Sequence, residues 1–265
     1  MGDSRQVTKA RSSVSATADL RELCRLRSDL EAFAVVRLRR SPDRVRIFQA
    51  LEVQMRQLRS AAMRGDYERF HLEDMALHRI VIETPGLAAL VRSWNLVSEE
   101  LDAWILQVKF TNWPSLMALY REHEYLVDAW NSDDDDAAAG ATHHHLEAGW
   151  YRVAMAQDAL PIEGTAVDRA ASFLSTHYAS SIDVKWMAEN ICFVSPSHLT
   201  RLFRAQFGKA PYAWLRQIRM ERAAELIAGC ARSVSAVARQ VGYRNASHFV
   251  RDFRAYHGVT PGKFH

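Results

Sequence analysis

Aspartate and histidine residues in the first 150 positions are spaced as the ligands of a metal ion would be. Asp74 and His78 are four residues apart, so in a helix their side chains lie on one face. His123 and the run His143–His145 add imidazoles from two further segments. One carboxylate with three imidazoles suits Zn²⁺, Ni²⁺ or Mn²⁺ and leaves positions open for a small ligand. With 11 histidines in the chain, the same spacing is also common in helices that bind nothing, and the triple histidine could be a solvated helix start.

Helices must position these side chains, because no segment shows the period-two alternation of a strand. Ser41-Pro42 has the cap and first-turn proline that open a helix, and Pro85-Gly86 ends one. Trp113-Pro114 and the acidic run Asp133–Asp136 are further predicted breaks. Residues 1–17, rich in Ser, Thr, Ala and Arg without periodicity, predict a flexible tail. We predict helices over residues 18–40, from 42 to about 64, from Gly65-Asp66 to about 83, and over 87–111, 114–131 and 137–157.

Charge divides the 265 residues into two parts. Residues 166–265 hold 14 Lys and Arg against 6 Asp and Glu, a net charge of +8, whereas the preceding 165 residues hold 20 against 25, a net charge of −5. Residues 158–165 between them include Pro161 and Gly164 and have no amphipathic period, so we place the linker there, after a first domain over 18–157. A basic block on an acidic body indicates a module that binds a polyanion, although charge alone does not separate DNA, RNA and membrane surfaces.

The basic block repeats itself at an offset of 50 residues. Eight positions in fifteen are identical, and the register does not change, so the block contains two copies of one supersecondary unit. The identical pairs are Ser197 and Ser247, His198 and His248, Arg201 and Arg251, Phe203 and Phe253, Arg204 and Arg254, Ala205 and Ala255, Gly208 and Gly258, and Pro211 and Pro261.

Each copy has the pattern of a helix-turn-helix. In the second, residues 234–241 form a short helix, Gly242 permits the turn, and Asn245 caps a helix that buries Phe249 and Phe253. Polar and basic residues then face outward, as contact with bases and phosphates requires. In the first, residues 185–191 support a presented helix over 195–206. Residues 211–229 predict one long helix as a rigid spacer, although the arginines could also be only a solvated helix face.

The last hundred residues resemble the DNA-binding domain of AraC/XylS-type transcription regulators, whose signature the segment from Ser233 to Pro261 follows almost throughout. The resemblance implies double-stranded promoter DNA and RNA polymerase as partners. Cys192 stands where the family has a small turn residue. For His198 and His248, the alternative to base contact is that they only support the turn. Implied base contacts are Ser197, Thr200 and Arg201 in the first copy and Ala246, Ser247, His248, Val250 and Arg251 in the second, with Arg204 and Arg254 on phosphates.

Residues 20–155 resemble the all-helical FCD effector domain of GntR-type regulators. The resemblance rests on short motifs: Arg27-x-x-Leu-Glu31, Asp74-x-x-x-His78, Glu122-His123 and Asp134…His145-Leu146. It implies a homodimer and a divalent metal, zinc or else nickel or manganese, on Asp74, His78, His123 and His145. That metal would anchor the carboxylate of a small organic or sugar acid, with Arg27 as ion-pair partner. Alternatively, Arg27 only pairs with Glu31 on its own helix.

Together these features predict an all-α chain, with an FCD-like bundle of six to seven helices before a seven-helix domain that holds two helix-turn-helix units. The leading hypothesis is a cytoplasmic one-component transcription regulator and not an enzyme. No apolar run is long enough for a membrane helix, no secretory signal is evident, and the three scattered cysteines favour a reducing compartment. The alternatives are a metal-dependent hydrolase with an attached nucleic-acid-binding module, and a metal sensor.

Overall fold

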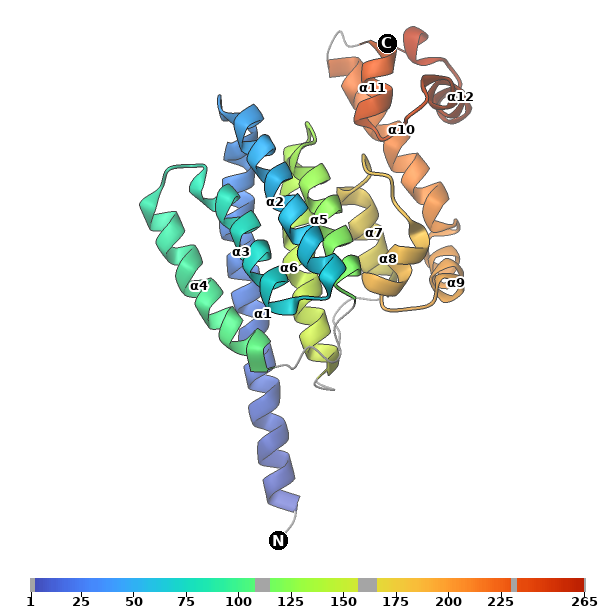
Figure 1. The fold of residues 1–265 in the computed structure, drawn as a ribbon. Coiled ribbons are helices and arrows are strands. Elements are labelled where there is room, and N and C mark those ends of the chain that lie inside the picture. Colours follow the sequence, from blue (N-terminus) through green and yellow to red (C-terminus); the bar gives the residue numbers. More distant parts are fainter. Residues whose placement is uncertain (1–2, 108–114, 157–165, 230–232, 265) are drawn as a thin grey trace. The chain divides into compact units, whose positions relative to one another are not determined.

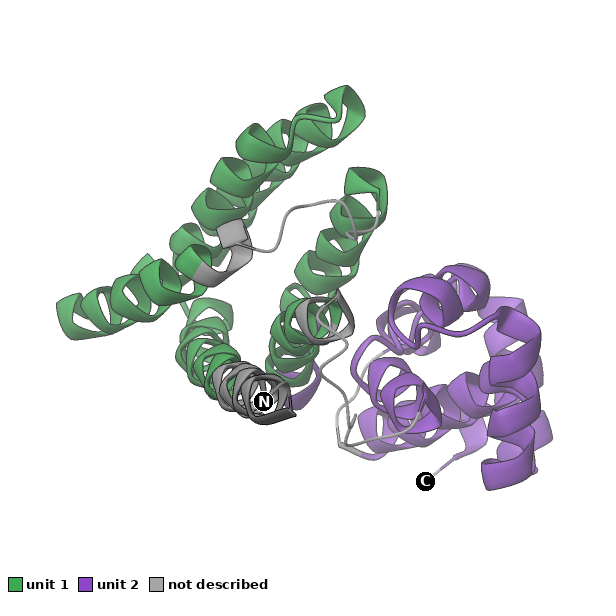
Figure 2. Cartoon of the chain, turned by 90° about the horizontal axis from the view of Figure 1, so that it is seen from below, with its two compact units in different colours: residues 1–131, 138–163 green, residues 132–137, 164–265 purple. Residues whose placement is uncertain are grey.

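The computed structural model describes residues 3–107, 115–156, 166–229 and 233–264, and every regular element in these ranges is a helix. The all-α fold that the sequence predicts is therefore confirmed. Contacts divide the chain into an N-terminal unit, residues 1–131 and 138–163, and a C-terminal unit, residues 132–137 and 164–265 (Figure 2). The predicted linker, residues 158–165, lies outside the described residues. None of the described helices combines the length and apolarity that a membrane crossing requires.

The first six helices, without the first three residues of α6, build the N-terminal unit (Figure 1). In the described part of the chain, the predicted spans agree to within a few residues, apart from the start of the first helix. The predicted end of the fourth helix at 111 and the predicted break at Trp113-Pro114 lie outside the described residues. The bounds are α1 Asp3–Arg39, α2 Arg44–Arg64, α3 Tyr67–Glu83, α4 Ala88–Gln107, α5 Leu116–Trp130 and α6 Asp135–Ala156.

Three boundaries differ from the sequence-based expectation, each for a local reason. The first helix extends back to Asp3 through the segment predicted as a flexible tail, where no proline or glycine interrupts a sequence of helix-compatible residues. Pro42 does not open α2, which begins after Asp43. The acidic run does not separate helices as a block either. Asp135 and Asp136 form the first turn of α6, where carboxylates interact favourably with the helix dipole.

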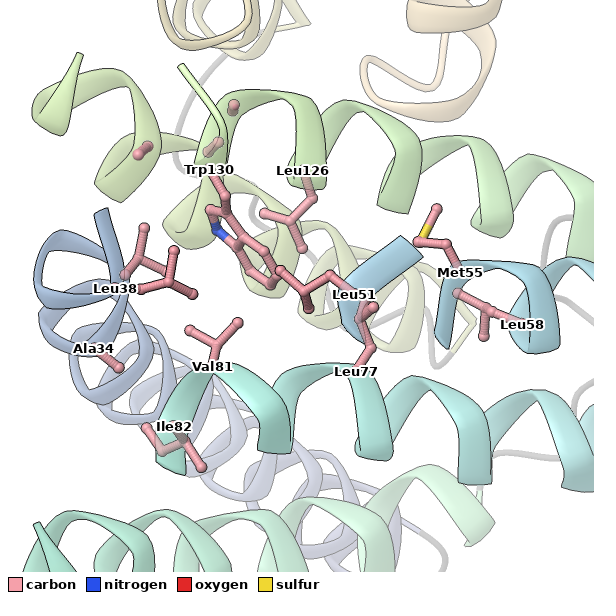
Figure 3. Close-up of a cluster of buried hydrophobic side chains, with 14 of the residues drawn as sticks. Ala34, Leu38, Leu51, Met55, Leu58, Leu77, Val81, Ile82, Leu126 and Trp130 are labelled. Atoms are coloured by element: carbon pink, nitrogen blue, oxygen red, sulfur yellow. The ribbon is translucent and has the colours of Figure 1, made fainter. Parts of the chain in front are cut away.

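Large apolar side chains from α1, α2, α3 and α5 meet in the core of the N-terminal unit (Figure 3). Leu38, Leu51, Val81 and Leu126 are fully buried, and the indole of Trp130 lies among them. Burial of each such side chain stabilises the fold by about 1.5–3 kcal/mol relative to exposure. This core fixes α3 against α1 and α5, and α3 and α5 carry three of the four candidate metal ligands.

The C-terminal unit consists of six α-helices and a final 3₁₀ turn in its described part. The second repeat reproduces the capping of the first at the same offset of 50 residues. Ser195 accepts a hydrogen bond from the backbone N–H of His198, Asn245 accepts one from that of His248, and the two presented helices end at left-handed Gly208 and Gly258. The elements are α7 Ala166–Thr176, α8 Val184–Asn190, α9 Pro196–Phe207, α10 Pro211–Gly229, α11 Val234–Gln240, α12 Ala246–His257 and η2 Pro261–Lys263.

Candidate functional site

The structure brings Asp74, His78, His123 and His145 together. Asp74 and His78 lie one turn apart on α3, His123 comes from α5 and His145 from α6. One ligand atom from each side chain lies within 4.8 Å of every other. Asp74 Oδ1 contacts His123 Nε2 directly and is 3.6 Å from His78 Nε2. Three segments that are far apart in the sequence thus place one carboxylate and three imidazoles around one point.

Hydrogen bonds outside the cluster fix how two of the imidazoles face it. His123 Nδ1 donates to the carbonyl oxygen of Leu119 at 2.8 Å, and His78 Nδ1 donates to Glu31 Oε2 at 2.7 Å. Both Nε2 atoms are therefore left with a lone pair directed at the cluster when the rings are neutral. A lone pair on His123 Nε2 against the Asp74 carboxylate is repulsive unless a proton or a metal ion lies between them. This donor set fits a divalent cation.

His145 is the member of the histidine run that joins the cluster. Successive residues on a helix point about 100° apart, and His143 accordingly turns to Ser28, with its Nδ1 2.7 Å from Ser28 Oγ. His145 Nδ1 and His78 Nε2 are buried and have no hydrogen-bond partner among the described residues. Burial is the largest cause that lowers the pKa of His145 well below its ordinary value, so this ring is neutral and able to coordinate.

The Asp74 carboxylate has a strongly lowered pKa. Burial alone would raise it, but the neighbouring imidazoles of His123 and His78 outweigh that effect. Burial would lower the pKa of His123, but the Asp74 carboxylate beside it raises that pKa above its ordinary value. The Asp74 carboxylate is therefore ionised and can bind a cation at the centre of the cluster.

Glu31, which is fully buried, connects the cluster to Arg27. Its Oε1 accepts hydrogen bonds from Arg27 Nε at 2.8 Å and from Trp94 Nε1 at 2.7 Å, while its Oε2 accepts from His78. Burial would raise the pKa of Glu31, but the charges of His78 and Arg27 and these hydrogen bonds lower it to about 2. The two sequence-based interpretations of Arg27 are thus compatible. It pairs with Glu31 along its own helix, yet the pair is buried and lies at the site.

A cavity of about 120 Å³ opens beside the cluster. Arg27 Nη2 is buried and has no hydrogen-bond partner in the described part of the chain, which leaves a donor for a ligand. Sequence reasoning missed His71, Arg152 and Trp150, although His71 precedes Asp74 by three residues and Arg152 follows His145 by seven, so helical spacing could have found them. The lining comprises Leu20, Cys24, Arg27, Tyr67, Phe70, His71, Asp74, His78, Leu101, Leu116, Leu119, Glu122, His123, His145, Leu146, Gly149, Trp150 and Arg152.

The predicted DNA-contacting residues lie on the two presented helices, α9 and α12. Leu199 and Phe203 bury one face of α9, and Phe249 and Phe253 bury the matching face of α12. The other faces remain accessible. Exposed residues are Ser197, Arg201, Arg204, Ser247, His248, Arg251 and Arg254, and half-buried ones are Thr200, Ala246 and Val250.

The turns of the two repeats differ at one position. In the second repeat, Gly242 adopts the left-handed conformation, with φ +82°. In the first, its counterpart Cys192 is fully buried, and the following residue, Phe193, takes the left-handed conformation with φ 57°. The departure at Cys192 is therefore accommodated by moving the left-handed residue one position along the chain.

Comparison with known protein families agrees with this division. Residues 22–148 match the model of the FCD domain, and residues 190–265 match that of a helix-turn-helix domain. The chain thus carries an FCD domain followed by a helix-turn-helix domain of AraC type.

Among characterised proteins, the chain is 31% identical over 115 residues to the arabinose operon regulatory protein of Salmonella typhimurium, covering 43% of this chain and 41% of that protein. It is 29% identical over 98 residues to the lactose operon transcription activator of Staphylococcus xylosus, covering 37% of this chain and 35% of that one. The chain therefore spans less than half the length of these relatives. A solved structure, the C-terminal domain of the response regulator AraT from Geobacillus stearothermophilus, is 29% identical, with a TM-score of 0.37 over 38% of this chain and 84% of that one.

Proposed function

We propose that this protein is a one-component transcription regulator that binds double-stranded promoter DNA and responds to a small carboxylic acid. The observation that carries the proposal is the presence of both sites in one chain. Two equivalent helices present accessible arginines, and a buried Asp-His cluster opens on a cavity in the FCD domain. The names of the relatives, an operon regulator and a transcription activator, favour this function over a metal-dependent hydrolase or a metal sensor.

The two repeats suit DNA because each leaves one polar and basic helix face accessible. Arg201 and Arg251 occupy equivalent positions on α9 and α12, where a guanidinium reaches base edges in a major groove. Arg204 and Arg254, one turn further along each helix, suit phosphate contacts. The rest of the chain carries a net negative charge, which directs the duplex to this unit.

The FCD domain suits an acid because an anion-binding group and a metal-binding group border one cavity. A divalent ion on Asp74, His78, His123 and His145 would supply a Lewis-acidic centre for a carboxylate. The free donor of Arg27, Nη2, is placed to hydrogen-bond a carboxylate at the same cavity. Binding there would change the presentation of the DNA-reading helices through a coupling free energy between the two sites.

The first test replaces the two equivalent arginines. In a mobility-shift titration with operator DNA selected from random duplexes, we expect Arg201→Ala with Arg251→Ala to weaken binding by about 100-fold or more, since each base contact contributes about 1–3 kcal/mol. The logarithm of wild-type affinity should fall steeply with the logarithm of salt concentration. Arg79→Ala, which removes an exposed arginine from the N-terminal unit, is the control. Unchanged binding by the double variant would contradict the proposal.

The proposal also includes a homodimer, contact with RNA polymerase and a cytoplasmic location, which rest on resemblance to the two domain families. Sedimentation of the intact chain at micromolar concentration tests the dimer independently of DNA.

A further inference from the structure

The cavity beside the cluster has a polar end and an apolar wall. Arg27, His71 and the imidazoles of the cluster lie close enough to Asp74 to interact with its charge. Leucine and aromatic side chains form most of the remaining lining. The apolar wall consists of Leu20, Tyr67, Phe70, Leu101, Leu116, Leu119, Leu146 and Trp150. A ligand that fills the cavity must therefore present an apolar body to this wall.

The cationic side chains at the polar end already have carboxylate partners. Arg27 pairs with Glu31, Arg152 contacts Glu122, and His71 Nε2 lies 3.4 Å from Asp102 Oδ1. With neutral imidazoles, a divalent ion against the single Asp74 carboxylate leaves one excess positive charge. One carboxylate neutralises that charge, and a second would be buried without a partner.

Most of the accessible surface of the cavity is apolar. Within the described ranges, the buried lining atoms outside the cluster that lack a partner include the donor Arg27 Nη2 and the acceptor Glu122 Oε2. Glu122 can accept from one hydroxyl group. The several hydroxyls of a sugar acid would lose their water against leucine and aromatic side chains, at a cost of about 1–3 kcal/mol for each unpaired group.

We infer that the effector is a monocarboxylate with an apolar body, and not a sugar acid or a dicarboxylate. This inference rests on the proposed acid-binding function and narrows its ligand class. The carboxylate occupies the polar end near Arg27 and the metal position, and the carbon chain lies along the wall formed by Leu101, Leu119 and Leu146.

Three acids of six carbons test the inference, because they differ in charge and polarity at equal chain length. Hexanoate, adipate and gluconate are titrated calorimetrically into the zinc-loaded full-length chain. We expect hexanoate to bind about tenfold or more tightly than either of the others, with a negative heat-capacity change that marks apolar burial. Tighter binding of adipate or gluconate overturns the inference but leaves the acid-binding function standing. Binding of none of the three overturns both.

A variant of the wall separates chain recognition from metal binding. Leu146 lines the cavity and is half-buried, so Leu146→Asn keeps the fold while placing an amide against the ligand. We expect it to weaken hexanoate binding by about tenfold and to leave zinc affinity, measured by chelator competition, unchanged. Leu96→Asn, at a surface leucine of α4, is the matched control. Equal hexanoate affinity in both variants would show that the wall does not contact the ligand.

Discussion

Glu31 has two carboxylate oxygens with separate tasks. Oε1 accepts from Arg27 and Trp94, and Oε2 accepts from His78 Nδ1. The second bond keeps the proton of His78 on Nδ1, so Nε2 presents a lone pair to the cluster. Glu31 is therefore a positioning residue for His78, although it does not itself belong to the four-ligand set.

Replacement of Glu31 by glutamine tests this assignment. The amide oxygen of the new side chain can keep the bonds to Arg27 and Trp94, but its NH₂ group would then face His78 Nδ1–H, and the imidazole must move its proton to Nε2. We expect zinc affinity to fall by about 10- to 100-fold, measured by competition with a chromophoric chelator. Asp29→Asn, at an exposed carboxylate on the same helix, should have no effect. Wild-type affinity in Glu31→Gln, with an unchanged melting curve, would mean that Glu31 does not set the tautomer.

The spacing of residues in the sequence predicts which side chains share a helix face, but not which helices meet. The four-residue interval between Asp74 and His78 predicts that the pair shares a face, but the run His143–His145 offers three candidates. Which of them meets Asp74 depends on the rotation of α6 against α3 and α5, which the tertiary packing sets. The burial of Arg27 and Glu31 could not be predicted from the sequence either, since a charged pair at that interval usually lies on a surface.

The helices themselves were more predictable than their ends. The bounds of α10, Pro211–Gly229, agree with the sequence because a proline opens it and a glycine ends it. The prediction that Pro42 opens α2 was wrong, because Pro42 and Asp43 form a turn before the helix begins at Arg44. The conformation of the first repeat's turn was not predictable, since nothing in the local sequence shows that Phe193, and not Cys192, takes the left-handed position.

The turn of the second repeat packs against the segment that follows α7. Arg219 of α10 donates hydrogen bonds to the carbonyl oxygens of Tyr178 and Ser180, at 2.7 and 2.8 Å, and this holds the segment after α7 against Gly242. A Cβ atom at Gly242 would lie 2.6 Å from the carbonyl oxygen of Ala179. Glycine is thus required there for space as well as for backbone conformation.

Two glycine variants separate these requirements. Gly208→Ala adds a methyl group at φ +71° with nothing within 4 Å, so only the left-handed conformation opposes it, at about 1–2 kcal/mol. Gly242→Ala adds the collision with Ala179, and we expect it to lower the free energy of unfolding by at least about 1 kcal/mol more. Urea unfolding of both variants gives the difference. Equal losses would show that the segment around Ala179 moves aside at no cost.

Under the proposed function, the charge and the geometry of the C-terminal unit together determine how it would read DNA. The basic residues 166–265 contain both repeats, and α10 contacts helices of each. A 19-residue helix is about 28 Å long, which approaches the roughly 34 Å between successive major grooves on one face of a duplex. Because α10 is continuous from Pro211 to Gly229 and contacts helices of both repeats, we expect the fold to fix the spacing of α9 and α12.

Fixed spacing predicts a periodic dependence on operator geometry. An insertion of about five base pairs between the half-sites turns the second one to the opposite face of the duplex. We expect this insertion to reduce affinity to that of Arg251→Ala on the original operator, since only one repeat can then engage. Arg251→Ala should in turn bind the original and inserted operators equally, which provides the control. Fluorescence anisotropy with labelled duplexes measures all four affinities. If wild type binds both operators equally, only one of the two repeats reads DNA.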